Sequence, residues 1–205
     1  MNVVFDFGVV LFTWEPARFL PDYFPARAAT PALASALATD VFSHADWHAF
    51  DQGLLTDKET VRRTAERLEL DAAALTGLLA RIPDLLTPVE GTVEILRGLH
   101  ERSRLRGDIK LFFLSNMPKP FARELEQRHS FLNWFDGGIF SGDVKLIKPQ
   151  PEIFQLMQQR FNLDPAQTLF IDDLQSNVYA ARTFGWQAVQ FVSSARLREH
   201  LTQAF

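Results

Sequence analysis

Polar residues stand where several apolar runs of the sequence end. They are Asp6, Ser115, Asn116, Asp172 and Asp173. The run before each is rich in β-branched and aromatic residues, which predicts a buried strand. Because ligands of open parallel sheets bind beyond the carboxyl ends of the strands, we expect these side chains on one rim of a sheet.

A shorter run, residues 138–140, is followed by Asp143, Lys145 and Lys148. Alone, each of these would be a turn, cap or solvated surface residue. On a rim shared with three carboxylates and a hydroxyl, an ammonium group can hold anionic oxygen atoms. The combination of residues, rather than any one of them, therefore indicates a ligand site.

The adjacent carboxylates of Asp172 and Asp173 indicate a bound cation. Two carboxylates about 4 Å apart repel each other by roughly 4 kcal/mol at an effective dielectric constant of about 20. Asp6 adds a third negative charge on the same rim. An all-oxygen ligand set favours Mg²⁺ over zinc or copper. A cation beside a carboxylate nucleophile, a hydroxyl and a lysine suits phosphoryl transfer.

The elements that must hold these residues alternate along the chain. Strands are expected over residues 3–7, 110–114, 138–140, 168–171 and 187–192. Helices are expected over residues 91–99, 120–128, 151–161 and 176–184. This alternation predicts an α/β fold with a mostly parallel sheet that is flanked by helices on both faces.

Residues 15–88 differ in composition: proline and alanine recur, and no segment convincingly predicts a strand. A helix is expected over residues 57–68, with Thr56 as its N-cap and Glu59 as the capping-box partner. We therefore expect two parts. Residues 1–14 and 89–205 would form an α/β core, and residues 15–88 would form an inserted, all-helical cap.

Composition and charge exclude several classes of protein. The 205 residues carry a net charge of −4, contain no cysteine and have no run of Lys and Arg longer than two. Disulfides, thiolate nucleophiles and cysteine zinc sites are therefore excluded, and a cytoplasmic location is expected. Nucleic acid is not an expected partner. Nor is a membrane, because the apolar stretch near the N-terminus is too short to span a bilayer.

Four segments in order resemble the motifs of the haloacid dehalogenase superfamily. They are residues 4–11 (VFDFGVVL), 113–116 (FLSN), 148–154 (KPQPEIF) and 170–173 (FIDD). The resemblance is to phosphatase-like members with a helical cap inserted after the first strand. It implies a Rossmann-like core and a hydrolase that acts on a small phosphorylated metabolite, for example a sugar phosphate.

The resemblance also implies roles for particular residues. Asp6 would be the nucleophile that forms an aspartyl-phosphate. Ser115 would bind a phosphate oxygen, helped by the backbone N–H of Asn116. Lys148 would stabilise negative charge on the nucleophile and the phosphate.

A Mg²⁺ ion would be held by Asp6, the backbone carbonyl of Gly8, Asp172 and Asp173. Asp173 is the stronger candidate for direct contact with the ion. Asn177 would either orient this cluster or cap the helix that follows it.

Gly8 is a departure from the family pattern. Most phosphatases of the family have a second Asp at this position, which protonates the leaving oxygen and later activates water. Its loss should slow turnover by about 10²–10⁴-fold, least for good leaving groups such as sugar 1-phosphates and acyl phosphates. Alternatively, a residue of the cap substitutes for it; the candidates are His44, Asp46, His48 and Asp51.

Three aromatic residues, Trp14, Trp47 and Phe50, could line a pocket over the rim or pack the cap against the core. Trp47 and Phe50 are three residues apart and so share a helical face. The physiological substrate and the oligomeric state are not determined by these patterns.

Three alternatives to a phosphatase remain open. The first is a metal-free hydrolase of the 2-haloacid dehalogenase type, which Asp172 and Asp173 make less favourable. The second is a binding or regulatory protein whose catalysis is weakened by Gly8. The third, a response-regulator receiver, is opposed by the inserted segment and by the position of Asp6 on the first strand.

Overall fold

A computed structural model describes residues 1–204 of the chain. Its centre is a five-stranded sheet with the order β3-β2-β1-β4-β5, in which every neighbouring pair is parallel. The strands are β1 (Asn2–Phe5), β2 (Lys110–Ser115), β3 (Gly137–Phe140), β4 (Thr168–Asp172) and β5 (Gln187–Gln190). The predicted α/β fold with a parallel sheet is confirmed.

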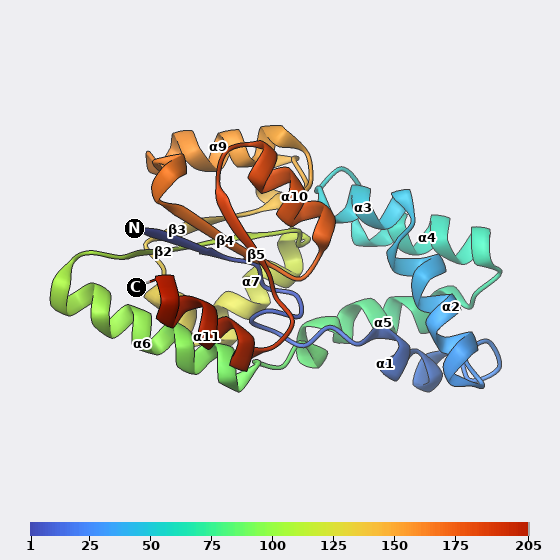
Figure 1. Ribbon diagram of the computed structural model, residues 1–205. Coiled ribbons are helices and arrows are strands. Elements are labelled where there is room, and N and C mark those ends of the chain that lie inside the picture. The colour runs from blue at the N-terminus through green and yellow to red at the C-terminus, as the bar shows by residue number, and fades with distance from the viewer. Residues whose placement is uncertain (205) are drawn as a thin grey trace.

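Helices cover both faces of this sheet, with α9 and α10 on one side and α6, α7 and α11 on the other (Figure 1). Their bounds are α6 (Glu90–Arg106), α7 (Lys119–Arg128), α9 (Pro151–Phe161), α10 (Gln175–Thr183) and α11 (Ser194–Ala204). Shorter elements are η1 (Ser130–Trp134), α8 (Ser141–Val144) and η2 (Pro165–Gln167). Alternate residues of β1 enter the two cores: Val3 and Phe5 join one cluster and Val4 the other, as the period of two along a strand requires.

Five helices lie between β1 and α6 in the chain, beyond the carboxyl ends of the strands (Figure 1). They are α1 (Pro16–Tyr23), α2 (Pro31–Phe42), α3 (Ala45–Asp51), α4 (Asp57–Leu68) and α5 (Ala72–Leu85). The predicted N-cap of α4 is confirmed, because the Thr56 side chain accepts the backbone N–H of Glu59. The Glu59 carboxylate instead accepts from Arg62 and Arg63.

The two chain segments that join these helices to the sheet run side by side. Thr13 donates its backbone N–H to Thr87 at 2.8 Å, and Val89 donates to Leu11 at 2.8 Å. The hydroxyls of Thr13 and Thr87 are 2.9 Å apart. The chain therefore leaves and re-enters the α/β part at one place.

Three predicted ends differ from the structure by two residues or more. β5 ends at Gln190 rather than at residue 192, and the other two differences have physical reasons. β1 ends at Phe5 rather than at residue 7, because the Phe7 carbonyl accepts hydrogen bonds from Leu11 and Phe12 in a tight loop. α6 continues to Arg106 rather than ending at residue 99. Its last turns are polar, so apolar spacing does not reveal them, and they end at Gly107 in a left-handed conformation. Within the described residues, every helix is too short or too polar to cross a bilayer.

Candidate active site at the carboxyl ends of the strands

Three carboxylates meet at the carboxyl ends of β1 and β4. Asp6 directly follows β1, and its backbone N–H donates to Ile171 of β4 at 2.9 Å. Asp6, Asp172 and Asp173 each offer a carboxylate oxygen, and these atoms lie within 4.8 Å of one another. The pairing of two strands that are far apart in the sequence thus brings the predicted acidic residues together.

Lys148 is buried among these carboxylates. Its Nζ lies 2.8 Å from Asp6 Oδ1 and 2.6 Å from Asp172 Oδ2, and its side chain is 1% exposed. Asp172 also accepts from Asn177 Nδ2 at 3.0 Å and from the Leu174 backbone N–H at 2.9 Å. Since Leu174 holds the N-cap position of α10, Asn177 orients the acidic cluster and does not cap the helix.

The negative charge of the cluster exceeds what one ammonium can balance. The pKa of Asp6 is raised to about 7. Burial is the main cause; the Lys148 ammonium lowers this pKa, and the carboxylates of Asp172 and Asp173 raise it further. Burial and Asp172 also raise the pKa of Asp173 to about 6. For Lys148, burial alone would lower the pKa, but the carboxylates of Asp172 and Asp6 outweigh it and raise the pKa. An all-oxygen set with excess negative charge fits a divalent cation.

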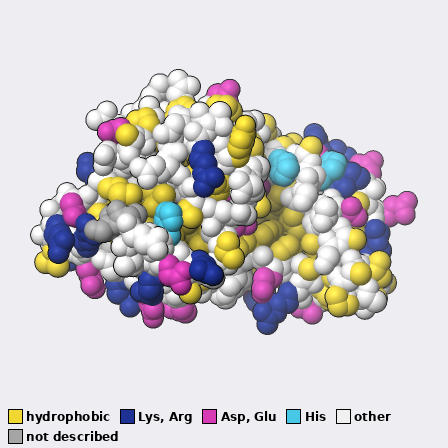
Figure 2. Space-filling view, viewed as in Figure 1, with side chains coloured by type: hydrophobic (Ala, Val, Ile, Leu, Met, Phe, Trp, Pro, Cys, Tyr) yellow, Lys and Arg dark blue, Asp and Glu magenta, His cyan; other side chains and the backbone are white. Residues whose placement is uncertain are grey.

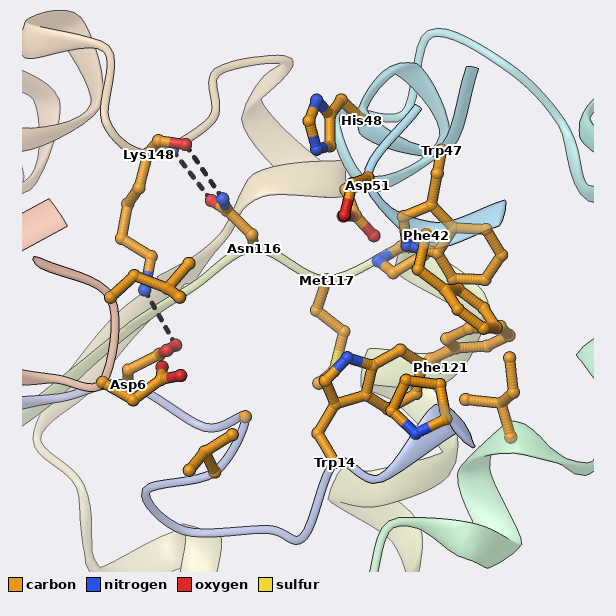
Figure 3. A pocket seen from close by; sticks show the side chains of 18 of the residues that line it. Asp6, Trp14, Phe42, Trp47, His48, Asp51, Asn116, Met117, Phe121 and Lys148 are labelled. Carbon is orange, nitrogen blue, oxygen red and sulfur yellow. Dashed lines mark hydrogen bonds and ion pairs between the residues drawn. The ribbon is translucent and has the colours of Figure 1, made fainter. Parts of the chain in front are cut away.

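The side chain of Asn116 holds the backbone of Lys148, a contact that sequence reasoning missed. Asn116 Nδ2 donates to the Lys148 carbonyl at 3.0 Å, and the Lys148 N–H donates to Asn116 Oδ1 at 2.8 Å (Figure 3). This pair joins the end of β2 to the loop before α9. No sequence signal predicts it, because the two residues are 32 positions apart. Ser115 is buried at the last position of β2, 1% exposed.

A cavity of about 400 Å³ opens beside the acidic cluster. Asp6, Lys148 and Asp173 line it, and Figure 3 shows Asp6 and Lys148 together at one end. Its apolar lining includes Trp14, Phe42, Trp47, Met117 and Phe121. The cavity therefore joins the predicted reactive carboxylates to a mostly apolar space between α2, α3 and α7.

Gly8 also lines this cavity, and the space beside it is open. A Cβ added at Gly8 would have nothing within 4 Å. The Gly8 carbonyl accepts the N–H of Val10 at 2.6 Å, which leaves its second lone pair for another partner. The position can thus supply a backbone oxygen, but it has no acid or base.

The four cap residues considered as substitutes for the missing acid divide into two pairs. His48 and Asp51 line the cavity, and burial raises the pKa of Asp51 well above its usual range. His44 Nδ1 instead lies 3.1 Å from Asp46 Oδ2, and neither residue is among those that line the cavity in the described chain. Asp46 also pairs with Arg63 of α4 at 3.5 Å.

Asp143 and Lys145, the other predicted residues of the rim, are not part of the acidic cluster. Asp143 accepts from Arg123 at 2.7 Å and lies 3.7 Å from Lys119. The Lys145 carbonyl accepts the Gln52 amide. Neither Asp143 nor Lys145 is among the described residues that line the cavity, so Lys148 alone of the three joins the acidic cluster.

Of the three aromatic residues singled out in the sequence, two line the cavity and one packs α3 against α7. Trp14 and Trp47 are part of the cavity wall. Phe50 is buried and meets Phe121 of α7 edge to face, with ring centroids 5.5 Å apart. The two interpretations are therefore compatible.

Comparison with known families identifies the chain. The family model of the haloacid dehalogenase-like hydrolases matches residues 9–185. The chain belongs to this family. The matched span includes the residues of β2, β4 and the Lys148 loop and begins three residues after Asp6. The family to which the sequence motifs pointed is thus confirmed.

Two curated relatives and one solved structure show where this haloacid dehalogenase-like hydrolase lies among known proteins. The sesquiterpene phosphatase astK of Aspergillus oryzae is 24% identical over 93% of this chain and 89% of its own length. The drimenol cyclase drtB of Aspergillus calidoustus is 27% identical over 99% of this chain, which covers 36% of that longer protein. The HAD family enzyme BT-2542 of Bacteroides thetaiotaomicron, solved with magnesium and inorganic phosphate, has a TM-score of 0.70 at 19% identity over 94% of each chain.

Proposed function

We propose that this hydrolase is a Mg²⁺-dependent phosphatase that forms an aspartyl-phosphate on Asp6. The observation that carries the proposal is the buried cluster of Asp6, Asp172, Asp173 and Lys148, which faces a cavity large enough for a small ligand. Several curated relatives, among them astK, bear the name phosphatase. Their names support the same reaction class for this chain.

The metal would be held by Asp6, Asp172, Asp173 and the carbonyl of Gly8. The raised pKa values of Asp6 and Asp173 and the oxygen-only donor set are the features that fit Mg²⁺. When bound, the ion would neutralise the charge of the phosphate and of the carboxylate that attacks it.

Asp6 Oδ would attack phosphorus as the P–O bond to the leaving group breaks, and the leaving oxygen would take a proton. Water would then hydrolyse the aspartyl-phosphate, returning the carboxylate and releasing inorganic phosphate. Ser115, the Asn116 N–H and the Lys148 ammonium would bind phosphate oxygens. The Asn116 side chain would keep Lys148 in place through its two hydrogen bonds to the lysine backbone.

We also propose that residues 15–88 act as a cap over a core of residues 1–14 and 89–205. The support is that the two segments connecting these parts run side by side at Thr13 and Thr87. A lid whose two connections lie at one place can move as a unit. Such a lid excludes water during the reaction and opens for product.

Phosphate release from p-nitrophenyl phosphate, acetyl phosphate and glucose 1-phosphate tests the proposal. Turnover should require Mg²⁺, stop on addition of EDTA and return when Mg²⁺ is restored in excess. Turnover that is indifferent to the chelator would contradict it. Chloride release from 2-chloropropionate would favour the dehalogenase alternative instead.

Mg²⁺ should stabilise the protein against heat at pH 8 and much less at pH 5. The pKa of Asp6 is raised to about 7 and that of Asp173 to about 6, so both carboxyls hold their protons at pH 5 and bind metal poorly. A raised carboxyl pKa stabilises the folded state at low pH. The metal-free protein therefore loses this contribution to its folding stability as the pH rises from about 4 through about 7. Bound Mg²⁺ offsets that loss at pH 8.

Thermal unfolding with and without Mg²⁺ at the two pH values measures this effect. The same shift of Tm at pH 5 and pH 8 would show that neither carboxyl takes part in binding. The Asp143→Asn variant should behave as the parent protein does, since its carboxylate pairs with Arg123 outside the cavity.

A further inference from the structure

A continuous arc of aromatic rings lies against the cavity. Trp14 meets Phe42 with centroids 5.0 Å apart, and Phe42 meets Trp47 at 4.5 Å. Trp47 meets Phe50 at 5.5 Å, and Phe50 in turn meets Phe121 at 5.5 Å. All four contacts are nearly perpendicular, the edge-to-face geometry that aromatic pairs prefer. The arc therefore forms a defined wall that runs from the cap helices to α7 of the core.

Buried apolar side chains form the interior of the cavity, and exposed polar ones lie at its mouth. Phe42, Trp47 and Phe121 are each less than 10% exposed, whereas Thr39 and His48 are exposed. In the space-filling view, hydrophobic side chains gather in the hollow between the α/β part and helices α1–α5 (Figure 2). Figure 3 shows Met117 between Asp6 and the aromatic group. A ligand with its phosphate at Asp6 would thus reach the aromatic wall with its other end.

Among the described residues, helices α1–α5 add no lysine or arginine to the cavity wall. Among the described residues that line the cavity, Lys148 is the single lysine or arginine, and it already pairs with Asp6 and Asp172. Asp51, the acidic residue that the cap adds to the wall, has a raised pKa because it is buried. A second phosphate or a carboxylate on the substrate would therefore have no cationic partner at the far end.

We propose that the substrates are phosphate monoesters whose organic group is a bulky, apolar hydrocarbon rather than a sugar or a carboxylic acid. This inference rests on the proposed function, since it identifies the substrate class of the same site. The apolar group would occupy the space beside Trp14, Phe42 and Trp47 while the phosphate lies at Asp6. Burial of hydrocarbon against this wall is favourable, and sugar hydroxyls placed there would lose hydrogen bonds to water without replacement.

A series of 4-alkylphenyl phosphates tests the proposal. Methyl, ethyl and propyl substituents change the apolar area while the acidity of the leaving phenol stays nearly constant. With Mg²⁺, kcat/KM should rise about fourfold for each added methylene until the cavity is filled. The matched polar compound is 4-(2-hydroxyethyl)phenyl phosphate, in which a hydroxyl replaces the last methyl of the propyl group, and it should be a poorer substrate than the propyl ester.

Two tryptophan variants locate the effect in the cavity. Trp14→Ala removes part of the wall and should lower kcat/KM for the propyl ester by at least about tenfold, with a smaller effect on the hydroxyethyl ester. Trp134→Ala is the matched control, because Trp134 is also partly buried in the core cluster but stacks on His100 and lies outside the cavity wall. It should leave the selectivity between the two esters unchanged.

The outcomes separate this inference from the proposed function. Turnover that needs Mg²⁺ and Asp6 but does not vary with alkyl length would overturn the inference alone. If no ester releases phosphate, the proposed function fails, and calorimetric titration of the full chain with the corresponding 4-alkylbenzylphosphonates in Mg²⁺ still decides the inference. There, Kd should fall about fourfold per methylene, and a Kd independent of alkyl length would overturn it.

Discussion

The Asp6→Asn variant should lose phosphatase activity by at least about 10⁴-fold, because an amide cannot attack phosphorus in place of a carboxylate. It should nevertheless fold. The pKa of Asp6 is raised to about 7 by burial and by the neighbouring acids, so its ionised form is disfavoured in the native state. A neutral amide of the same shape removes that penalty and loses one contact with Lys148, which keeps its contact with Asp172.

Release of phosphate from acetyl phosphate in saturating Mg²⁺, together with Tm, measures this effect. Asp143→Asn is the matched control, since it makes the same chemical change on the same side of the sheet outside the cavity. It should retain activity close to that of the parent. Activity above one-tenth of the parent value in a folded Asp6→Asn protein would eliminate Asp6 as the nucleophile.

The second large effect is a gain, expected for Gly8→Asp. This change places a carboxyl two residues after the proposed nucleophile, where a Cβ meets no atom within 4 Å and the backbone does not need the left-handed region that favours glycine. A general acid and base typically contributes about 10²–10⁴-fold. Hydrolysis of simple alkyl phosphates should rise by about that factor, because their alkoxide leaving groups need a proton.

The dependence on the leaving group distinguishes acid catalysis from a general improvement. Acetyl phosphate, whose leaving group is already stable as an anion, should gain far less than the alkyl esters. Gly98→Asp is the matched control, on an exposed face of α6 where an added Cβ also meets nothing, and it should change neither rate. An unchanged rate for alkyl phosphates in a folded Gly8→Asp protein would mean that another group, such as Asp51 or His48, already supplies the proton.

Gly8 links the two proposals made for this enzyme. Without an acid at that position, the reaction depends more on a stable leaving group or on a substitute from the cap, and the structure brings only His48 and Asp51 of the four candidates to the cavity. Both lie on α3, the helix that also contributes Trp47 to the aromatic wall. If both proposals hold, helix α3 would influence both the choice of substrate and the supply of a proton.

Local patterns predicted most of the framework. The helix Asp57–Leu68 follows from the Thr56 cap, and the helix Pro151–Phe161 from its apolar spacing and its N-terminal proline. The strands follow from short apolar runs. Where local patterns failed, as in the last turns of α6, most residues are polar, so the apolar periodicity does not extend over them.

Residue patterns alone were enough to predict the family, the parallel sheet and the convergence of Asp6, Asp172 and Asp173, because strand ends in such a sheet must meet at one rim. Lys148, in the loop before α9, was predicted there from its motif. Which residues of α3 face the rim depends on tertiary packing. His48 and Asp51 line the cavity, whereas His44 caps α3 by accepting the Asp46 N–H and Asp46 pairs with Arg63. The Asn116–Lys148 contact and the aromatic wall likewise join residues far apart in the chain. Such contacts depend on how the helices pack, which local sequence does not specify.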